Sequence, residues 1–216
     1  MSIDFKGRVA IVTGAGGGLG KQHALALAAR GAKVLVNDLG GDVHGVGGSV
    51  SAAQAVVDEI RAAGGEAMAN GASVTDFEAV KAMVQQAVDA WGRVDILVNN
   101  AGILRDKSFA KMELADFKLV MDVHVMGAVH CTKAVWPIMQ AQNYGRIVMT
   151  TSSSGLYGNF GQANYGAAKL AQVGLMQTLG IEGAKHHIHV NALAPTAATR
   201  MTEGLMPEEV LAALKP

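Results

Sequence analysis

The chain of 216 residues carries 18 basic and 18 acidic side chains, and this balance gives no electrostatic reason to expect binding to nucleic acid or to an anionic membrane. Its single cysteine, Cys131, excludes an internal disulfide framework and fits a reducing compartment. Half of the residues are hydrophobic, yet no apolar run is long enough to span a bilayer, and the first residues do not resemble a signal peptide. We therefore expect a soluble intracellular, cytoplasmic protein.

Strand and helix patterns alternate along the whole chain. Short apolar, β-branched runs predict strands, and segments with apolar residues at helical spacing predict the helices between them. The predicted strands are 8–13, 33–38, 66–73, 94–102, 145–153 and 187–195, and the predicted helices are 19–31, 49–65, 76–92, 113–141 and the region of Tyr165. Asp76 is expected to cap the third helix, and Pro137 to distort the fourth.

Six repeats of this alternation indicate a parallel sheet covered by helices on both faces, the doubly wound (Rossmann) α/β fold in a single domain. We expect a cofactor half over about 1–102 and a catalytic and substrate half over about 103–216. Ligands of such sheets lie outside the carboxyl ends of the strands, so the segments of interest are 14–20, 38–48, 73–75, 99–105, 151–161 and 195–205.

A glycine-rich stretch, "TGAGGGLGK" at 13–21, joins the first strand to the first helix. It matches neither a strict G-x-G-x-x-G pattern nor a Walker A motif, but it places Gly14, Gly18 and Gly20 at a strand–helix turn. Glycines at such a turn let the backbone approach a pyrophosphate at the helix N-terminus. The alternative is a tight turn that binds no ligand.

The second strand ends at Asp38, which could accept hydrogen bonds from the adenosine ribose of a dinucleotide. Its charge would repel the 2′-phosphate of NADP, and the neighbouring Gly17, Leu39 and Gly40 supply no basic group to offset that repulsion. The sequence therefore predicts NAD. The alternative is an ordinary loop aspartate.

The stretch "YGAAK" places Tyr165 and Lys169 one helical turn apart, on the same face of a predicted helix. A free phenol has a pKa near 10, too high for a good base at neutral pH, and a nearby ammonium would lower it. Ser152, at the end of the fifth predicted strand, precedes this pair. The alternative is a packing pair beside a serine-rich loop.

Together, the sequences "TGAGGGLG" at 13–20, "NNAG" at 99–102, Ser152, "YGAAK" at 165–169 and "NALAP" at 191–195 resemble the short-chain dehydrogenase/reductase family over the whole chain. The resemblance implies hydride transfer between NAD and a secondary alcohol or ketone. It implies that Tyr165 is the acid/base, that Lys169 assists it and holds the nicotinamide ribose, and that Ser152 binds the substrate oxygen.

The same resemblance implies a set of residues that contact the cofactor, with Ser73 and Val74 at the adenine and 195–199 at the carboxamide of nicotinamide. The set is Gly14, Gly18, Leu19, Gly20, Asp38, Ser73, Val74, Asn100, Gly102, Tyr165, Lys169, Pro195, Thr196 and Thr199.

One position departs from the family pattern. Most members carry an asparagine in the fourth helix that holds a water for proton relay, whereas this chain has His124 there, in "VHVMG". The histidine could relay protons as a further catalytic residue, or it could be a buried polar group satisfied by a backbone carbonyl.

Further stretches, among them 36–49, 99–112 and 154–170, resemble the (3R)-hydroxyacyl-CoA dehydrogenase branch of the family, which is part of peroxisomal multifunctional enzymes type 2. This implies an acyl-CoA substrate, a homodimer or homotetramer, and a peroxisomal location in a eukaryote. The alternatives are a dehydrogenase of 17β-hydroxysteroids or other alcohols, and a non-catalytic dinucleotide-binding protein.

Three features remain beside this interpretation. The family continues with a seventh strand, so we expect the natural protein to extend beyond Pro216. Arg105 and Lys107 could contact a coenzyme A phosphate or belong to a solvated loop. His187 and His189 would share a strand face, but no third ligand is evident, so we predict no metal site.

Overall fold

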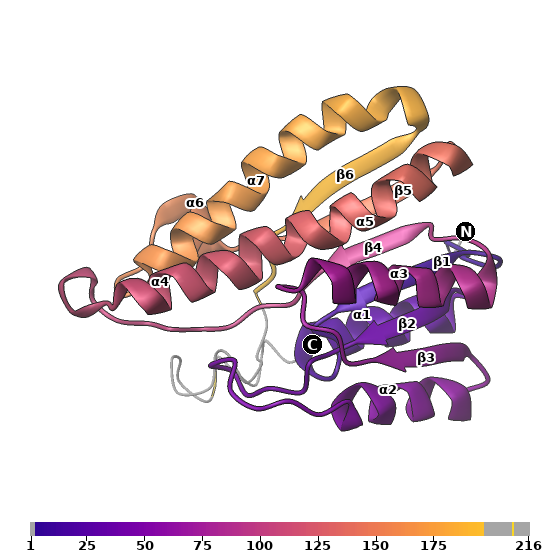
Figure 1. The fold of residues 1–216 in the computed structure, drawn as a ribbon, viewed down its shortest axis with the longest axis horizontal. Helices are drawn as coiled ribbons and strands as arrows, with labels where there is room; N and C mark the ends of the chain where they lie inside the picture. Colours follow the sequence, from indigo (N-terminus) through magenta and orange to yellow (C-terminus); the bar gives the residue numbers. More distant parts are fainter. Residues whose placement is uncertain (1–2, 197–208, 210–216) are drawn as a thin grey trace.

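The computed structural model of the protein describes residues 3–196 and 209, and its centre is a parallel sheet (Figure 1). The order of the strands is β3-β2-β1-β4-β5-β6, and every pair of neighbours is parallel. The strands are β1 (Val9–Thr13), β2 (Lys33–Asn37), β3 (Glu66–Asn70), β4 (Ile96–Asn99), β5 (Gly145–Thr150) and β6 (Ile188–Leu193). The predicted doubly wound fold is confirmed.

The strands are apolar on both faces because helices cover both sides of the sheet. In β1, Val9 and Ile11 pack in one hydrophobic cluster with α3 (Phe77–Trp91) and α5 (Gly127–Gln142). Ala10 and Val12, which point the other way, pack with α1 (Gly18–Ala29) and α2 (Ser51–Ala62). Helix α7 (Ala163–Gly183) joins α3 and α5 on their side of the sheet (Figure 1).

Helix α3 begins and ends where local sequence predicts. The Asp76 carboxylate accepts hydrogen bonds from the backbone N–H groups of Glu78 and Ala79, so the predicted cap is confirmed. At the other end Gly92 adopts φ of 76°, the left-handed conformation that ends many helices.

The predicted helix 113–141 consists of three parts. These are α4 (Leu114–Met121), a π-helical stretch η2 (Asp122–Met126) and α5, which runs through Pro137 without interruption. Pro137 and Lys133, one turn earlier, are both exposed, so the carbonyl that the proline leaves unbonded can bind water. The irregularity therefore lies at His124 instead of at Pro137.

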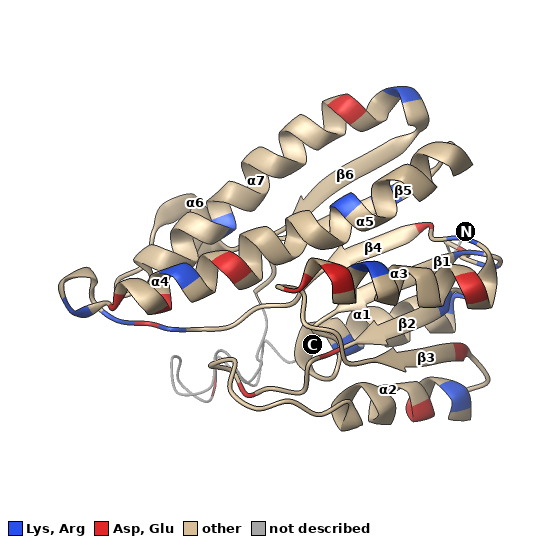
Figure 2. Cartoon of the chain, in the orientation of Figure 1, with Lys and Arg blue, Asp and Glu red and all other residues tan. Residues whose placement is uncertain are grey.

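Three short elements were not predicted: η1 (Phe109–Lys111), α6 (Ser153–Tyr157) and η3 (Ala184–His186). Figure 2 shows charged residues of both signs along the helices and connecting loops, with few on the strands. Among the described helices, none combines the length and the apolar character that crossing a membrane requires.

Candidate active site

A cleft of about 790 Å³ lies along the carboxyl ends of the strands. Its lining includes all of the predicted site residues that the structure describes, while Thr199 lies outside the described residues. These lining residues are Gly14, Gly18, Leu19, Gly20, Asp38, Ser73, Val74, Asn100, Gly102, His124, Ser152, Tyr165, Lys169, Pro195 and Thr196.

The glycine loop (residues 13–20) packs tightly against the turn that follows β4. The Asn100 side chain donates hydrogen bonds to the carbonyls of Thr13 and Gly14, at 3.0 and 2.9 Å. A Cβ on Gly20 would lie only 2.2 Å from the Gly14 oxygen and 2.5 Å from Asn100 Nδ2. Gly14 itself has φ of 62°. Both glycines are therefore required by the packing of the loop.

The start of α1 fits a phosphate group. Gly17, the residue before the helix, offers no side chain to cap it, and the first turn contains no acidic residue. Within the described part of the chain, the free N–H groups at the start of this helix are therefore left without a capping side chain. Gly17 and Gly18 line the cleft, so this uncompensated helix end faces the space where a dinucleotide would lie.

Asp38 stands at the end of β2 beside the glycine loop. Its carboxylate accepts hydrogen bonds from Gly16 N and from Gly40 N, each at 2.7 Å. A Cβ on Gly16 would lie 2.8 Å from the carboxylate, so only glycine fits there without a shift. These contacts fix a negative charge at the lip of the cleft.

Lys169 and Tyr165 lie on one face of α7, as predicted. The Lys169 side chain is buried and donates a hydrogen bond of 2.6 Å to the Thr150 carbonyl, with Nζ 5.4 Å from the centre of the Tyr165 ring. The Thr151 hydroxyl donates to the Lys169 carbonyl at 2.7 Å, which ties the end of β5 to α7. Ser152 follows at once and caps α6.

Burial dominates the ionisation of this pair. It lowers the pKa of Lys169 to about 7. Burial also raises the pKa of Tyr165; a hydrogen bond with Ser152 acts against that increase, and the charge of Asp106 adds to it. The sequence predicts that Lys169 lowers the tyrosine pKa, but here its amine is directed at Thr150, and the phenol is held in its protonated form.

His124 is buried beside this pair. Its Nε2 lies 3.0 Å from Ile103 N and 2.9 Å from Ile103 O, and its ring meets the Tyr165 ring edge to face. Burial, followed by the charge of Lys169, lowers the pKa of His124 to about 3, so the ring is neutral. A Cβ on Gly102 would lie 2.4 Å from the imidazole. These contacts favour a buried polar group bonded to the backbone over a proton relay.

Sequence reasoning missed two buried amides near the site. Gln172 donates a 2.7 Å hydrogen bond to the carbonyl of His124, within η2. Asn164 bonds both to Arg105 and to the backbone of Tyr165. The available signal was position, because Gln172 follows Lys169 by one helical turn and Asn164 directly precedes Tyr165. Arg105 itself bonds to the His44 carbonyl and pairs with Asp116.

A model of the short chain dehydrogenase family matches residues 8–209. The chain belongs to this family. It is 57% identical over 214 residues to peroxisomal multifunctional enzyme type 2 of the mouse, Mus musculus, and the match covers 99% of this chain but 29% of the mouse protein. The predicted family and branch are confirmed. The chain spans less than half of the length of the multifunctional relatives from mouse, Drosophila and Dictyostelium.

Two solved structures share the fold. Full-length peroxisomal multifunctional enzyme type 2 from Drosophila melanogaster has 46% identity and a TM-score of 0.78, covering 99% of this chain and 34% of that one. A 7α-hydroxysteroid dehydrogenase, solved with NADH and 7-oxo glycochenodeoxycholic acid, has 33% identity and a TM-score of 0.86, covering 96% of this chain and 78% of that one. A nucleotide cofactor and a small-molecule substrate are thus supported for this short-chain dehydrogenase.

Proposed function

We propose that this short-chain dehydrogenase oxidises (3R)-3-hydroxyacyl-CoA to 3-ketoacyl-CoA with NAD. The observation that carries the proposal is the meeting of Tyr165, Lys169 and Ser152 in one cleft with the glycine loop and Asp38. The substrate follows from the similarity to enzymes named peroxisomal multifunctional enzyme type 2 and peroxisomal hydratase-dehydrogenase-epimerase.

The cleft offers a place for each part of the cofactor. When bound, NAD would take up a hydride from the carbon that bears the substrate oxygen, or return one to it. The uncompensated start of α1 would hold the pyrophosphate, and Asp38 would accept hydrogen bonds from the adenosine ribose. Ser73 and Val74 would lie along the adenine, and Asn100 and Gly102 along the middle of the dinucleotide.

The catalytic groups would act at the substrate oxygen. The Ser152 hydroxyl would hydrogen-bond to that oxygen and orient it. Tyr165 Oη would donate a proton to it in ketone reduction and accept one in alcohol oxidation. Lys169 would hold the nicotinamide ribose. Alcohol oxidation requires the Tyr165 phenolate, and Lys169 would stabilise it by its charge at a distance, since the amine itself bonds to Thr150. His124 would keep Ile103 and the tyrosine ring in place without relaying a proton.

We propose NAD in preference to NADP. The support is the Asp38 carboxylate beside the glycine loop, whose negative charge would repel a 2′-phosphate on the adenosine ribose. The residues that follow it, Leu39 to Gly41, carry no positive charge. Residues 195–199 would hold the carboxamide end of nicotinamide.

We further propose that residues 1–216 form one dehydrogenase domain, with a cofactor half at about 1–102 and a catalytic half at about 103–216. A homodimer or homotetramer would be its assembly. A peroxisomal location would follow in a eukaryote, because the multifunctional relatives carry that word in their names.

The decisive experiment is NADH formation with (3R)- and (3S)-3-hydroxyacyl-CoA side by side, repeated with NADP. Turnover of the R isomer with NAD alone supports both the substrate and the role of Asp38. If neither isomer is turned over although NAD still binds, the proposed acyl-CoA substrate is wrong.

The 33% identity to a 7α-hydroxysteroid dehydrogenase makes a hydroxysteroid the second candidate substrate, and it belongs in the same assay. Turnover of the steroid without turnover of either acyl-CoA would establish that candidate. NAD binding without turnover of any of these alcohols would favour a non-catalytic dinucleotide-binding protein.

A further inference from the structure

The segment after β4, residues 103–107, has no regular secondary structure, and its first two residues, Ile103 and Leu104, line the cleft. We call it the bridging segment. Its first residue, Ile103, is held by His124. Because the backbone groups of the following residues bond to distant parts of the chain, this segment connects elements that are far apart in the sequence.

On one side, the bridging segment bonds to the loop between β2 and α2. Leu104 N donates to the Val43 carbonyl at 2.9 Å, and the Leu104 carbonyl lies 3.0 Å from His44 Nδ1. The Arg105 side chain donates to the His44 carbonyl at 2.9 Å. This loop begins at Asp38, so the bridging segment is tied to the wall of the cleft where the adenosine ribose would bind.

On the other side, it bonds to the start of α7. The Arg105 carbonyl accepts a 3.0 Å hydrogen bond from Asn164 Nδ2. Asp106 accepts one of 2.7 Å from the Gln162 side chain, and Lys107 N donates to the Gly161 carbonyl at 2.9 Å. The segment therefore also borders the residues that lead into Tyr165.

Asn164 is completely buried, with 0% of its surface exposed, and it does not line the cleft. Its Oδ1 accepts a 2.7 Å hydrogen bond from Tyr165 N. That N–H lies in the first turn of α7, where a helix offers no acceptor of its own. Both ends of the amide are therefore used, since Nδ2 faces a carbonyl and Oδ1 faces an N–H.

We propose that Asn164 is a positioning residue, which fixes the backbone of Tyr165 to the bridging segment and thereby to the loop that begins at Asp38. The inference rests on the proposed function, because it assumes that Tyr165 is the acid/base. Asn164 touches neither substrate nor cofactor in this role. It sets where the phenol stands relative to the cofactor wall, and a small displacement of a reacting group can reduce turnover strongly.

The test is the substitution Asn164→Asp, which keeps the size and the acceptor for Tyr165 N but turns a second oxygen toward the Arg105 carbonyl. Gln142→Glu is the matched control at the opposite end of the sheet. The Gln142 amide likewise donates to a carbonyl, Val94 O at 2.8 Å, and accepts from an N–H, Val94 N at 3.0 Å. Both variants place a carboxylate oxygen against a backbone carbonyl.

We expect Asn164→Asp to lower kcat with (3R)-3-hydroxyacyl-CoA by about 10- to 100-fold. The Kd for NADH, measured by fluorescence titration, should stay within about twofold, because Asp38 keeps its own hydrogen bonds to Gly16 and Gly40 even where the later part of its loop exchanges faster. As the pH is lowered, kcat relative to the wild type should recover, since a protonated carboxyl can again donate to the Arg105 carbonyl. Gln142→Glu should leave kcat unchanged, even if it lowers Tm by as much as Asn164→Asp does.

Hydrogen exchange supplies a readout that does not need turnover. Amides of residues 42–46 and 103–107 should exchange faster in Asn164→Asp and at the wild-type rate in Gln142→Glu. Unchanged exchange in these two segments, or a kcat loss equal to that of the control, would overturn the proposal. If the wild type turned over no substrate, the proposed function would fail separately, and the exchange rates would still decide whether Asn164 makes this connection.

Discussion

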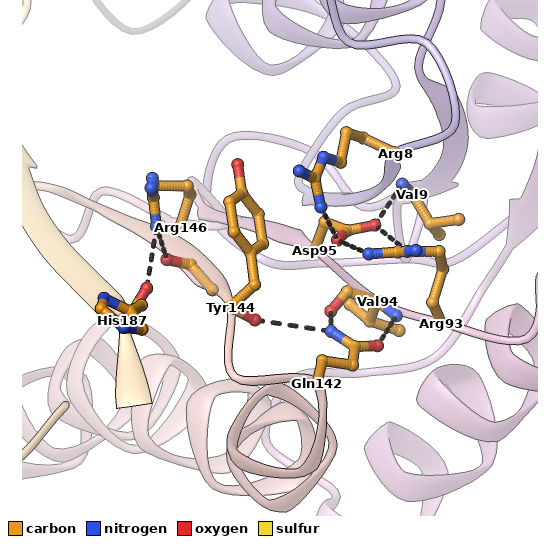
Figure 3. A network of polar contacts seen from close by, with 10 residues as sticks. Arg8, Val9, Arg93, Val94, Asp95, Gln142, Tyr144, Arg146 and His187 are labelled. Atoms are coloured by element: carbon orange, nitrogen blue, oxygen red, sulfur yellow. Dashed lines mark hydrogen bonds and ion pairs between the residues drawn. The ribbon is translucent and has the colours of Figure 1, made fainter. Parts of the chain in front are cut away.

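The two ends of the sheet hold their buried polar groups in opposite ways. At the amino ends of the strands, the buried Asp95 carboxylate accepts hydrogen bonds from Arg8, from Arg93 and from the backbone of Val9 (Figure 3). Burial alone would raise the pKa of Asp95, but the hydrogen bonds from Arg93, Val9 and Arg8 outweigh it, and the pKa is lowered. The charge is fully paired there.

The pairing extends to the neighbouring loop. The Tyr144 ring lies between two guanidinium groups, 3.8 Å from that of Arg8 and 4.3 Å from that of Arg146. Gln142 bonds to both backbone groups of Val94, and Arg146 donates to the carbonyl of His187 (Figure 3). This end has the contacts expected of a structural anchor.

At the carboxyl ends, polar groups are buried without full pairing. Among the residues that the structure describes, four such side-chain atoms without a hydrogen-bond partner lie near the cleft: Asn99 Oδ1, His124 Nδ1, Thr150 Oγ1 and Gln172 Oε1. Lys169 is buried, no carboxylate of residues 3–196 pairs with it, and its pKa falls to about 7. Such groups are destabilising in themselves, so their collection at one end indicates that this end is arranged for chemistry.

The largest expected effect is that of Tyr165→Phe at the carboxyl end. Loss of the phenolic hydroxyl should lower kcat by about 10² to 10⁴-fold, because it removes the proposed acid/base. NADH binding should be unchanged in a fluorescence titration. Tyr144→Phe makes the same change at the amino end and should retain full kcat; equal losses in the two variants would erase the distinction between the ends.

Lys169→Met should lower kcat by about 10²-fold or more, yet raise the free energy of unfolding. Such a result would sharpen the contrast between the carboxyl end of the sheet, where polar groups serve chemistry, and the amino end, where they serve stability. The folded pKa of about 7 lies below the ordinary 10.5, so the unfolded state binds more protons between these values, and the stability contributed by this lysine rises with pH. The cost of burying its charge is therefore largest below pH 7.

Thermal unfolding as a function of pH checks this expectation. The Tm of Lys169→Met should exceed that of the wild type below pH 7, and the difference should shrink as the pH rises toward 10. Lys133→Met, an exposed change on α5, serves as the control and should show no such trend. A lower Tm for Lys169→Met at every pH would mean that the buried ammonium stabilises the fold.

Asp95→Asn, at the amino end of the sheet, should have the opposite effects to Lys169→Met: it should lower the stability of the fold and leave kcat unchanged. Leaving two arginines without their carboxylate should cost roughly 3 kcal/mol at pH 7, seen as a Tm about 6 to 12 °C lower. Because the folded pKa is depressed, the contribution is present above the ordinary value of 3.8 and is lost as the pH falls through the folded pKa.

The Tm difference between wild type and Asp95→Asn should therefore persist from pH 7 down to about pH 5 and shrink in stronger acid. Asp89→Asn, an exposed change on α3, is the control. A large drop in kcat for Asp95→Asn, measured well below its Tm, would show that the amino end also takes part in catalysis.

The smallest effect concerns cofactor choice. Asp38→Asn removes a charge worth roughly 1 kcal/mol against a 2′-phosphate, so the ratio of kcat/KM with NADP to that with NAD should rise about five- to tenfold. Asp58→Asn, on the exposed side of α2, should leave the ratio unchanged. No change in Asp38→Asn would remove the basis for proposing NAD.

Local signals made most of the fold predictable from the sequence. Strand and helix order follow from period and β-branched content, and Asp76 and Gly92 mark the ends of α3 because capping depends on adjacent residues only. The place of the cleft was predictable because loops that follow parallel strands meet at one edge of the sheet, whereas the roles of the individual residues came from the resemblance to the family.

What could not be predicted depends on long-range contacts. Nothing in the local pattern shows that Lys169 bonds to Thr150, or that the loop between β2 and α2 reaches the bridging segment. The π-helical stretch η2 coincides with a carbonyl bonded by Gln172, a residue 48 positions away. A period-based prediction sees only a continuous helix there, and it assigns the irregularity to the nearest proline.

The contact between Gly20 and Asn100 has a consequence for transplanting the cleft into another protein. The glycine loop and the "NNAG" turn are distant in sequence, yet the missing Cβ of Gly20 makes room for Asn100 Nδ2 and for the Gly14 oxygen. The residue at position 20 therefore has to be compatible with the side chain at position 100, although the two motifs are far apart in the sequence. A glycine loop grafted alone onto a foreign parallel sheet would lack the turn against which it packs. Chimeric proteins with a crossover between the two motifs should therefore fail to fold more often than chimeras that inherit both motifs from one parent.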